Sequence, residues 1–533
     1  MPDRAAKKVV TAWTERLEPL HRESSLAWWA SNTEASAANT TRFRAALTAV
    51  EEASEDADGF ARLERSLAEP LADAATRRSL EVLRRDLLPF QGPRDVRLQL
   101  VDLRASVNER FSSVRGTVRG KSLGDNEIVD VLKRSDDVAL REETWKASKQ
   151  VGAAVADDVR RLARLRNQVA RALGHPDHYT FALRQQDVDP AWLDAFLTRL
   201  DEATAAPFAA YKAALDARLA RRFRVDPSAL RPWHYEDPFF QEAPETGRPS
   251  FDRLFAGRDL VDLTVRTYDA LGLDVRPAVE RSDLLPRAGK CQHAFCTHID
   301  RRGDVRVLCN NVPNERWTGT MLHEFGHAIY DLEIDRGLPW VLRRPPHMSS
   351  TEAIAMLFGR LSKDAAWLVP VLGLAPSEAK DVAAAAGPAF AEGMLVFTRW
   401  VMVMARFERA LYADPEQDLD TLWWDLVERY QRVRRPDGRK APDWAAKIHI
   451  ATAPVYYHSY LMGECTASQL LHHVRTTTGQ GLVGNRAAGT FLRDVFFRPG
   501  STRSWNDHLA AATGKPLEPT AFLADIAAAS ASA

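Results

Sequence analysis

The sequence predicts a mainly α-helical protein that contains one short β-hairpin. Apolar residues recur at three- and four-residue spacing over most of the chain, which is typical of helices with one buried face. Proline and glycine lie mostly between these periodic segments, where they end one helix before the next begins. We expect helices over residues 9–20, 43–67, 78–88, 98–110, 138–173 and 192–219.

One region departs from the helical pattern. Residues 294–299 and 305–309 are apolar and β-branched segments that flank a short loop containing Gly303. This arrangement predicts a β-hairpin. Because only 13 residues separate Cys309 from His323, we expect the hairpin to lie beside the segment that follows it.

The composition is that of a globular protein with a large core. The chain has 533 residues, of which 45% are apolar, and its formal net charge is zero. A neutral chain has no global field that favours nucleic acid or an anionic membrane, and no apolar run is long enough to span a bilayer. The N-terminus lacks the features of a signal peptide, so we expect a cytoplasmic protein. Four cysteines are too few for a disulfide-dependent fold.

The most informative motif is His-Glu-Phe-Gly-His at residues 323–327. On a helix, His323 and His327 lie one turn apart on one face, where two imidazoles can bind one Zn²⁺. Glu324 beside them could take a proton from the attacking water. A catalytic zinc needs a third protein ligand, and Glu352, 25 residues after His327, could supply it from a second helix. A chance occurrence is the alternative, but the apolar flanks favour a buried helix.

A second segment, residues 447–460, collects one lysine, two histidines and three tyrosines. Peptide hydrolysis passes through an oxyanion, which a tyrosine or histidine can stabilise as a hydrogen-bond donor. Lys447 could bind the carboxylate of a free peptide C-terminus. The alternative is structural, because tyrosines at three- or four-residue spacing also form buried aromatic stripes on helices.

These two motifs resemble those of the zinc peptidases related to angiotensin-converting enzyme, a helical group that includes thimet oligopeptidase and oligoendopeptidase F. Weaker similarities occur at residues 25–33, 132–146, 166–179 and 504–519. The resemblance implies a two-lobed helical peptidase with a deep central channel, one zinc ion per chain and short peptides as substrates. We expect an N-terminal lobe at 1–225, a proline-rich connection at 226–250 and a zinc-bearing lobe at 251–533, interleaved as one structural unit.

The resemblance also assigns the metal ligands and the catalytic groups. His323, His327 and Glu352 would hold zinc, and Glu324 would be the general base and acid. His449 and one tyrosine would contact the scissile carbonyl or a neighbouring one. Tyr460 fits the position of this tyrosine better than Tyr456 does.

Substrate-binding residues follow from the same resemblance. Lys447 and Gln241 would meet the substrate carboxylate, with Tyr457 as the second of the paired tyrosines. His293 and Ala294 would belong to an edge strand that pairs with the substrate backbone.

The chain departs from the converting enzymes at several positions. The fourth residue after Glu352 is Met356, where those enzymes have an aspartate that supports a ligand histidine, so the supporting group must differ here. Ser459 replaces a chloride-binding arginine, so we do not expect chloride activation. Cys291 and Cys309 match a disulfide pair of secreted relatives, and we expect reduced thiols at both.

Release of C-terminal dipeptides is the activity that these residues favour. The alternatives are an endo-acting oligopeptidase, a biosynthetic metallohydrolase on the same scaffold, and a catalytically silent binding protein. The presence of Glu324 argues against a silent protein. We expect short peptides as partners, with no nucleic acid and no membrane, and the sequence leaves the oligomeric state open.

Overall fold

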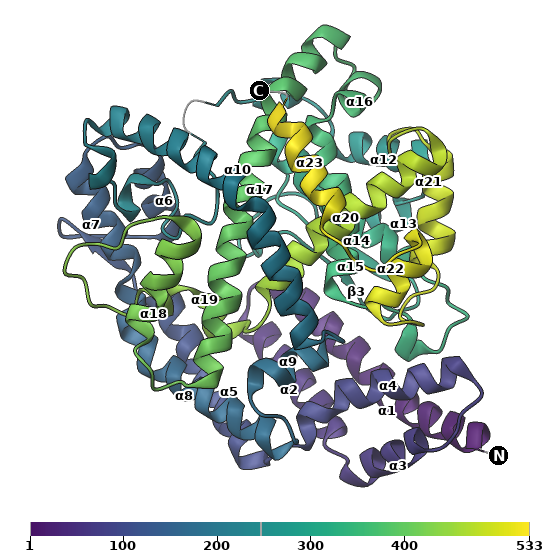
Figure 1. The fold of residues 1–533 in the computed structure, drawn as a ribbon. Helices are drawn as coiled ribbons and strands as arrows, with labels where there is room; N and C mark the ends of the chain where they lie inside the picture. The colour runs from purple at the N-terminus through teal and green to yellow at the C-terminus, as the bar shows by residue number, and fades with distance from the viewer. Residues whose placement is uncertain (1, 246–247, 532–533) are drawn as a thin grey trace. The chain divides into compact units, whose positions relative to one another are not determined.

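The computed structural model describes residues 2–245 and 248–531 and confirms the mainly α-helical class (Figure 1). Within these ranges the only sheets are two antiparallel pairs. They are β1 (Gly116–Val118) with β2 (Lys121–Leu123), and β3 (Phe295–His298) with β4 (Val305–Leu308). The second pair is the hairpin predicted from the sequence. No helix in the described part combines the length and apolar character that a membrane span needs.

The chain forms two compact units, each built from three separate segments. Unit 1 comprises the described residues of 1–91, 250–384 and 462–522, and unit 2 those of 92–249, 385–461 and 523–533. The lobe boundaries given above stay a prediction. Three helices have residues in both units: α17 (Pro376–Ala413), α20 (Tyr457–Thr478) and α23 (Thr520–Ala531).

The remaining helices of unit 1 (η marks short 3₁₀ or π helices) are α1 (Pro2–Thr33), α2 (Ala37–Ser54), α3 (Ala57–Ala68), α4 (Ala74–Leu87), η1 (Leu88–Gln91), α11 (Asp252–Phe255), α12 (Leu260–Leu271), α13 (Arg276–Val279), α14 (Glu315–Glu333), η4 (Trp340–Leu342), α15 (Met348–Gly359), η5 (Arg360–Lys363), α16 (Ala365–Trp367), η6 (Leu368–Leu372), α21 (Arg486–Phe491), η9 (Leu492–Phe497) and α22 (Trp505–Thr513).

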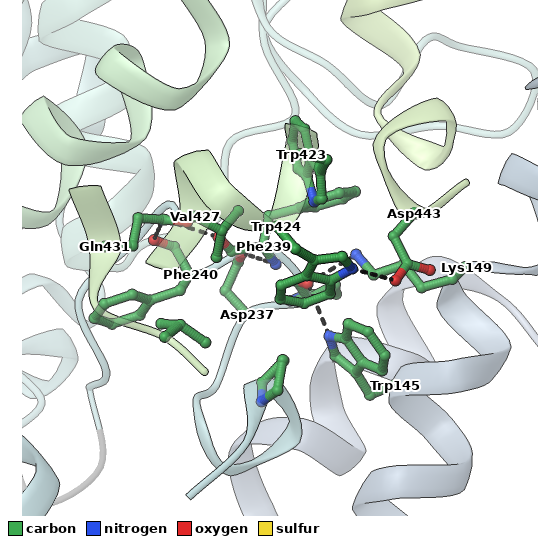
Figure 2. A pocket seen from close by; sticks show the side chains of 13 residues that line it. Trp145, Lys149, Asp237, Phe239, Phe240, Trp423, Trp424, Val427, Gln431 and Asp443 are labelled. Carbon is green, nitrogen blue, oxygen red and sulfur yellow. Dashed lines mark hydrogen bonds between the residues drawn. The ribbon is translucent and has the colours of Figure 1, made fainter. Parts of the chain in front are cut away.

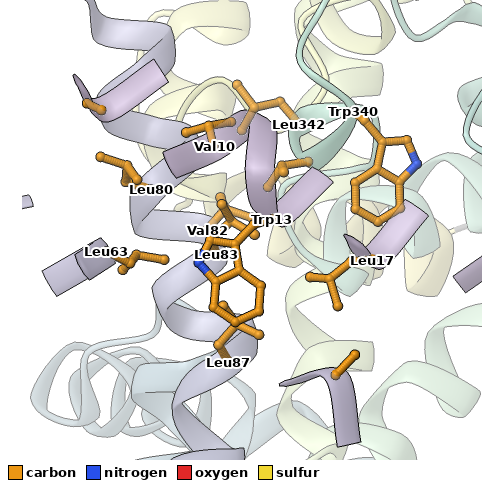
Figure 3. Close-up of a cluster of buried hydrophobic side chains, with 13 residues drawn as sticks. Val10, Trp13, Leu17, Leu63, Leu80, Val82, Leu83, Leu87, Trp340 and Leu342 are labelled. Carbon is orange, nitrogen blue, oxygen red and sulfur yellow. The ribbon is translucent and has the colours of Figure 1, made fainter. Parts of the chain in front are cut away.

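A buried apolar cluster joins the N-terminal helices to η4 within unit 1 (Figure 3). Trp13 of α1 and Leu83 of α4 pack in it with Leu342. The helix expected over 43–67 is two helices, because Asp56 caps the start of α3 by accepting the N–H of Gly59. Apolar periodicity continues across this cap, so periodicity alone could not locate the break.

The remaining helices of unit 2 are α5 (Arg94–Ser113), α6 (Asp125–Arg134), α7 (Val138–Ser148), α8 (Gln150–Ala172), α9 (His178–Gln185), α10 (Pro190–Phe223), η2 (Pro227–Ala229), η3 (Pro232–His234), α18 (Leu419–Leu426), η7 (Val427–Gln431), η8 (Asp443–Ala446) and α19 (Ile448–Thr452).

The helix expected over 138–173 is interrupted at Lys149, which lies between α7 and α8. Its backbone N–H bonds the carbonyl of Lys146, three residues back, which tightens the last turn of α7. Its ammonium group is buried and donates to the carbonyl of Pro238. The break thus coincides with a buried side-chain contact, which no sequence period reveals.

Candidate active site

The His-Glu-x-x-His motif lies in the middle of α14, as predicted. The helix begins after Asn314, whose side chain accepts the N–H of Trp317 at 2.8 Å. Its apolar face is fully buried, including Leu322, Phe325 and Ile329. A capped, buried helix of this kind holds the two motif histidines in a fixed relation.

The second helix of the site, α15, lies directly against α14 and carries Glu352 (Figure 1). The close approach depends on Gly326, which lies between the motif histidines. A Cβ atom at Gly326 would lie 2.8 Å from the Cα of Ala355, closer than real Cβ atoms come to backbone. Gly463 of α20 also lies close to α15, because a Cβ atom at Gly463 would lie 3.2 Å from the Cβ of Glu352.

Two imidazoles and one carboxylate converge between these helices. The Nε2 atoms of His323 and His327 lie 3.7 and 3.9 Å from Oε2 of Glu352. One ligand atom from each of the three residues lies within 4.8 Å of the others, and no other such group of three occurs among the described residues. The spacing suits atoms that share one ion at about 2.0–2.2 Å from each.

The electrostatics of the group suit a divalent cation. Burial lowers the pKa of His323 to about 4, and burial with the neighbouring imidazole lowers that of His327 to about 3, so both rings are neutral and could bind a metal ion. Burial raises the pKa of Glu352 to about 7. For Glu324, burial and then the Glu352 carboxylate raise the pKa to about 8. A cation between these groups would offset the free-energy cost of burying both carboxylates in their charged form.

The second ring nitrogen of His327 has a partner that the sequence analysis missed. Nδ1 of His327 lies 2.7 Å from Oγ1 of Thr351, the residue before Glu352. When Nε2 binds a metal ion, Nδ1 carries the ring proton and donates to the hydroxyl. The hydroxyl therefore takes the supporting role that an aspartate at position 356 could have filled.

His293 and Ala294 lie just before the first strand of the hairpin. β3 begins at Phe295, so neither residue is in the strand; the His293 side chain is exposed and Ala294 is half-buried. β3 pairs with β4 in the register Phe295↔Leu308 and has no second partner strand in the described ranges. An edge without a partner strand is of the kind to which an extended backbone can add.

Lys447 and Gln241, which are 206 positions apart in the sequence, meet within unit 2. Nζ of Lys447 donates to Oε1 of Gln241 at 2.6 Å. The ammonium group also lies 5.2–5.4 Å from the ring centres of Phe239, Trp400 and Tyr457. Its side chain is buried, and it forms no ion pair with any described carboxylate.

Gln241 ends a tight turn that begins at Asp237, and Figure 2 shows Asp237, Phe239 and Phe240 of this turn. Asp237 accepts the backbone N–H groups of Phe239 and Gln241, and also Nε2 of the Gln241 side chain at 3.1 Å. Phe240 has a left-handed conformation with φ 50°, and Gln431 donates to the carbonyls of Phe239 and Phe240. Because Asp237 takes the amide N–H, the amide oxygen of Gln241 faces Lys447.

His449 and the tyrosines pack together next to Lys447. The ring centre of His449 lies 4.9 Å from that of Tyr457, and Tyr460 lies 5.8 Å from Tyr457 and 5.1 Å from Tyr456. Burial, and then the charge of Lys447, lower the pKa of His449 to about 4, so its ring is neutral. Its Nδ1 is buried and has no hydrogen-bond partner in the described part of the chain.

The structure thus collects the predicted site residues in two groups. In unit 1 it brings together the two motif histidines and Glu352, with Glu324 on the same helix. In unit 2 it brings together Lys447 with Gln241, and His449 with the tyrosines. Cys291 and Cys309 are free thiols.

Comparison with protein families divides the chain into two matching parts. Residues 2–202 match the family described as angiotensin-converting enzyme, and residues 265–528 match peptidase family M3. The second match contains the whole of α14 and α15 and the segment 447–460. The chain is a gluzincin metallopeptidase. Comparison with curated proteins gives no match.

This assignment confirms the predicted enzyme class and the predicted cofactor. Both families are zinc peptidases, and a histidine–histidine–glutamate group lies at metal-binding distance in the peptidase. The peptidase acts on peptides. Gln241 lies in the segment between the two family matches, residues 203–264, so its relation to Lys447 comes from the structure and not from the comparison.

Proposed function

We propose that this zinc peptidase is a peptidyl-dipeptidase, which cuts short peptides two residues before a free C-terminus. The observation that carries the proposal is the pairing of Lys447 with Gln241. The proposal includes two lobes that flank a substrate channel, and a cytoplasmic location.

The metal ligands in this proposal are His323, His327 and Glu352. Two neutral imidazoles and one carboxylate are a donor set that suits a catalytic zinc with an open position. When bound, zinc polarises the scissile carbonyl and lowers the pKa of water.

Glu324 is the general base and acid. It follows His323 directly, and without a cation burial and then Glu352 raise the pKa of its carboxyl to about 8, whereas a cation held by the neighbouring ligands would favour the ionised form that accepts a proton. An ionised carboxyl group can accept a proton from the attacking water and return it to the leaving amine near neutral pH.

Tyr460 donates a hydrogen bond to the developing oxyanion, and the neutral His449 contacts the neighbouring carbonyl. Tyr460 lies in the first turn of α20, where its ring packs against those of Tyr456 and Tyr457. A phenol can donate to an oxyanion without competing for the metal.

Lys447, Gln241 and Tyr457 form the carboxylate site. A buried ammonium group without an ion pair destabilises the free protein, so a partner of opposite charge would gain strongly there. Gln241 supplies further polar contact, because its amide is already fixed by Asp237. His293 and Ala294 lead into the open edge of β3, to which the substrate backbone adds as a strand.

An endo-acting oligopeptidase is the second candidate. The family M3 match over the zinc motif favours it, because that match includes every proposed metal ligand. Such an enzyme would ignore the free C-terminus, and Lys447 would then have a purely structural role.

Matched peptides with free or amidated C-termini separate the two candidates. A peptidyl-dipeptidase releases dipeptides from the free acids, identified by mass spectrometry, and loses this activity with a chelator. Lys447→Ala should lower kcat/KM for the free acids by roughly 10- to 200-fold and change that for the amides little. Equal loss on acids and amides would reject the carboxylate site.

A further inference from the structure

Val455 has a backbone conformation that its side chain disfavours. Its φ is 55°, in the left-handed region, although it is a β-branched residue. A valine there is a strained outlier and persists only where the surroundings hold it. Val455 is buried and lies two residues before Tyr457, at which α20 begins.

Two side chains from other parts of unit 2 hold both peptide groups of Val455. Its N–H donates to Oε1 of Glu408, on α17, at 2.7 Å. Its carbonyl accepts from Nε2 of Gln186, just after α9, at 3.0 Å. Oε1 of the same Gln186 lies 3.1 Å from Nε2 of His458.

The conformation of Val455 determines the direction in which the chain enters α20. A return to the extended region would turn the first residues of α20 away from their present course. Tyr457 and Tyr460 would move with them, because both lie in the first turn and their rings pack on each other. The two tyrosines therefore depend on Glu408 and Gln186 through the backbone of Val455.

We propose that Glu408 and Gln186 are positioning residues, which hold Val455 in its strained conformation and so direct Tyr457 and Tyr460 toward the substrate. This inference rests on the proposed function, which assigns the two tyrosines to the substrate. Glu408 is buried, and burial raises its pKa to about 8. A protonated carboxyl still accepts the Val455 N–H through its carbonyl oxygen.

The first test compares two substitutions of Glu408. Glu408→Leu removes the acceptor, and a tyrosine displaced by about 1 Å should lower kcat by roughly 10- to 100-fold while KM for amidated peptides changes little. Glu408→Gln keeps an oxygen acceptor of similar shape, so its kcat should stay within a few-fold of the parent. Equal loss in both variants would overturn the proposal.

The decisive test is rescue by glycine. Glycine adopts the left-handed region without steric strain, so Glu408→Leu combined with Val455→Gly should recover most of the lost kcat. The matched control is Ala453→Gly in the same background, since Ala453 has φ −134° and gains nothing from a left-handed region. No recovery with Val455→Gly, or equal recovery with Ala453→Gly, would show that Glu408 only stabilises the core.

Two further variants keep the tests decisive. If Glu408→Leu does not fold, Gln186→Met removes the other contact to Val455 and is tested with the same glycine rescue. Tyr460→Phe separates this inference from the proposed function. Near-normal activity of Tyr460→Phe would rule out Tyr460 as the donor to the oxyanion. The glycine rescue would still show whether the conformation of Val455 is needed for catalysis.

Discussion

Nδ1 of His327 lies 2.7 Å from the hydroxyl oxygen of Thr351, so one proposed ligand histidine contacts the residue that precedes the proposed carboxylate ligand. Thr351 and Glu352 are neighbours on α15, and therefore one helix supplies both a proposed ligand and the support for another. A shift of α15 would disturb both contacts together. The metal site should thus respond sharply to changes at the α14–α15 contact.

The first prediction concerns this hydroxyl. Thr351→Val keeps the shape of the side chain but removes the acceptor for His327, so zinc affinity should fall by roughly 10- to 100-fold. Competition with a chromophoric chelator measures the affinity directly. Thr351→Ser retains the hydroxyl and is the control. Unchanged affinity in the valine variant would show that the hydroxyl has no part in orienting the ring.

The second prediction concerns the contact between the two helices. Gly326→Ala places a methyl group 2.8 Å from the Cα of Ala355, and backbone cannot move aside as a side chain can. We expect a loss of about 1–3 kcal/mol in the free energy of unfolding, together with weaker zinc binding. Chemical denaturation with and without zinc measures both effects.

Gly393 provides the matched control for that substitution. It is also inside a helix, α17, but a Cβ there would meet no atom within 4 Å. Gly393→Ala should therefore leave zinc binding unchanged and stabilise the protein by up to about 1 kcal/mol through helix propensity. A destabilised Gly393→Ala would mean that the loss at Gly326 is not specific to the contact with α15.

The third prediction separates the proposed base from the proposed ligands. Glu324→Gln keeps the size of the side chain and leaves the ligand set intact, so zinc content and thermal unfolding should match the parent. Turnover should fall by about 10²- to 10⁴-fold, because no group remains to take the proton from water. Near-normal turnover would mean that another residue activates the water.

Sequence reasoning succeeded where local geometry determines the site. The spacing of His323 and His327 requires only a helix to bring the rings together, and the apolar flanks predict that helix. The hairpin beside it followed from a similar local pattern. Glu352 could be suggested by its spacing, because a helix packed on the first is enough to deliver it.

The contacts that sequence reasoning missed are side-chain relations between distant segments. Nothing in the sequence says which hydroxyl faces His327, although the threonine next to the expected ligand was an available candidate. The family resemblance placed Lys447 and Gln241 at one carboxylate site, but it did not predict their direct bond, which joins positions 206 residues apart. The left-handed Val455 has no local signal at all, because valine is the residue that such a position disfavours.

The last prediction is a pH dependence that we assign to Lys447. Burial lowers the pKa of Lys447 to about 8, although the charges of Asp237 and Glu242 act in the opposite direction. The amine is therefore charged below about pH 8 and neutral above it. Since only the charged form attracts a carboxylate, kcat/KM for free-acid peptides should fall as pH rises through about 8.

Dividing kcat/KM for free-acid peptides by that for the matched amides isolates this effect. Titrations at the metal site change kcat/KM for both substrates alike and therefore cancel in the ratio. His449 is already neutral throughout this pH range, and burial raises the pKa of Tyr457 far above it. Lys447→Arg keeps its charge at all these pH values and should abolish the fall in the ratio. Lys149 also lies over the ring of Phe239, and burial lowers its pKa to about 7. Lys149→Met is therefore the control, and it should leave the fall of the ratio with pH unchanged. A ratio that does not change with pH in the parent enzyme would rule out Lys447 as the group that binds the carboxylate.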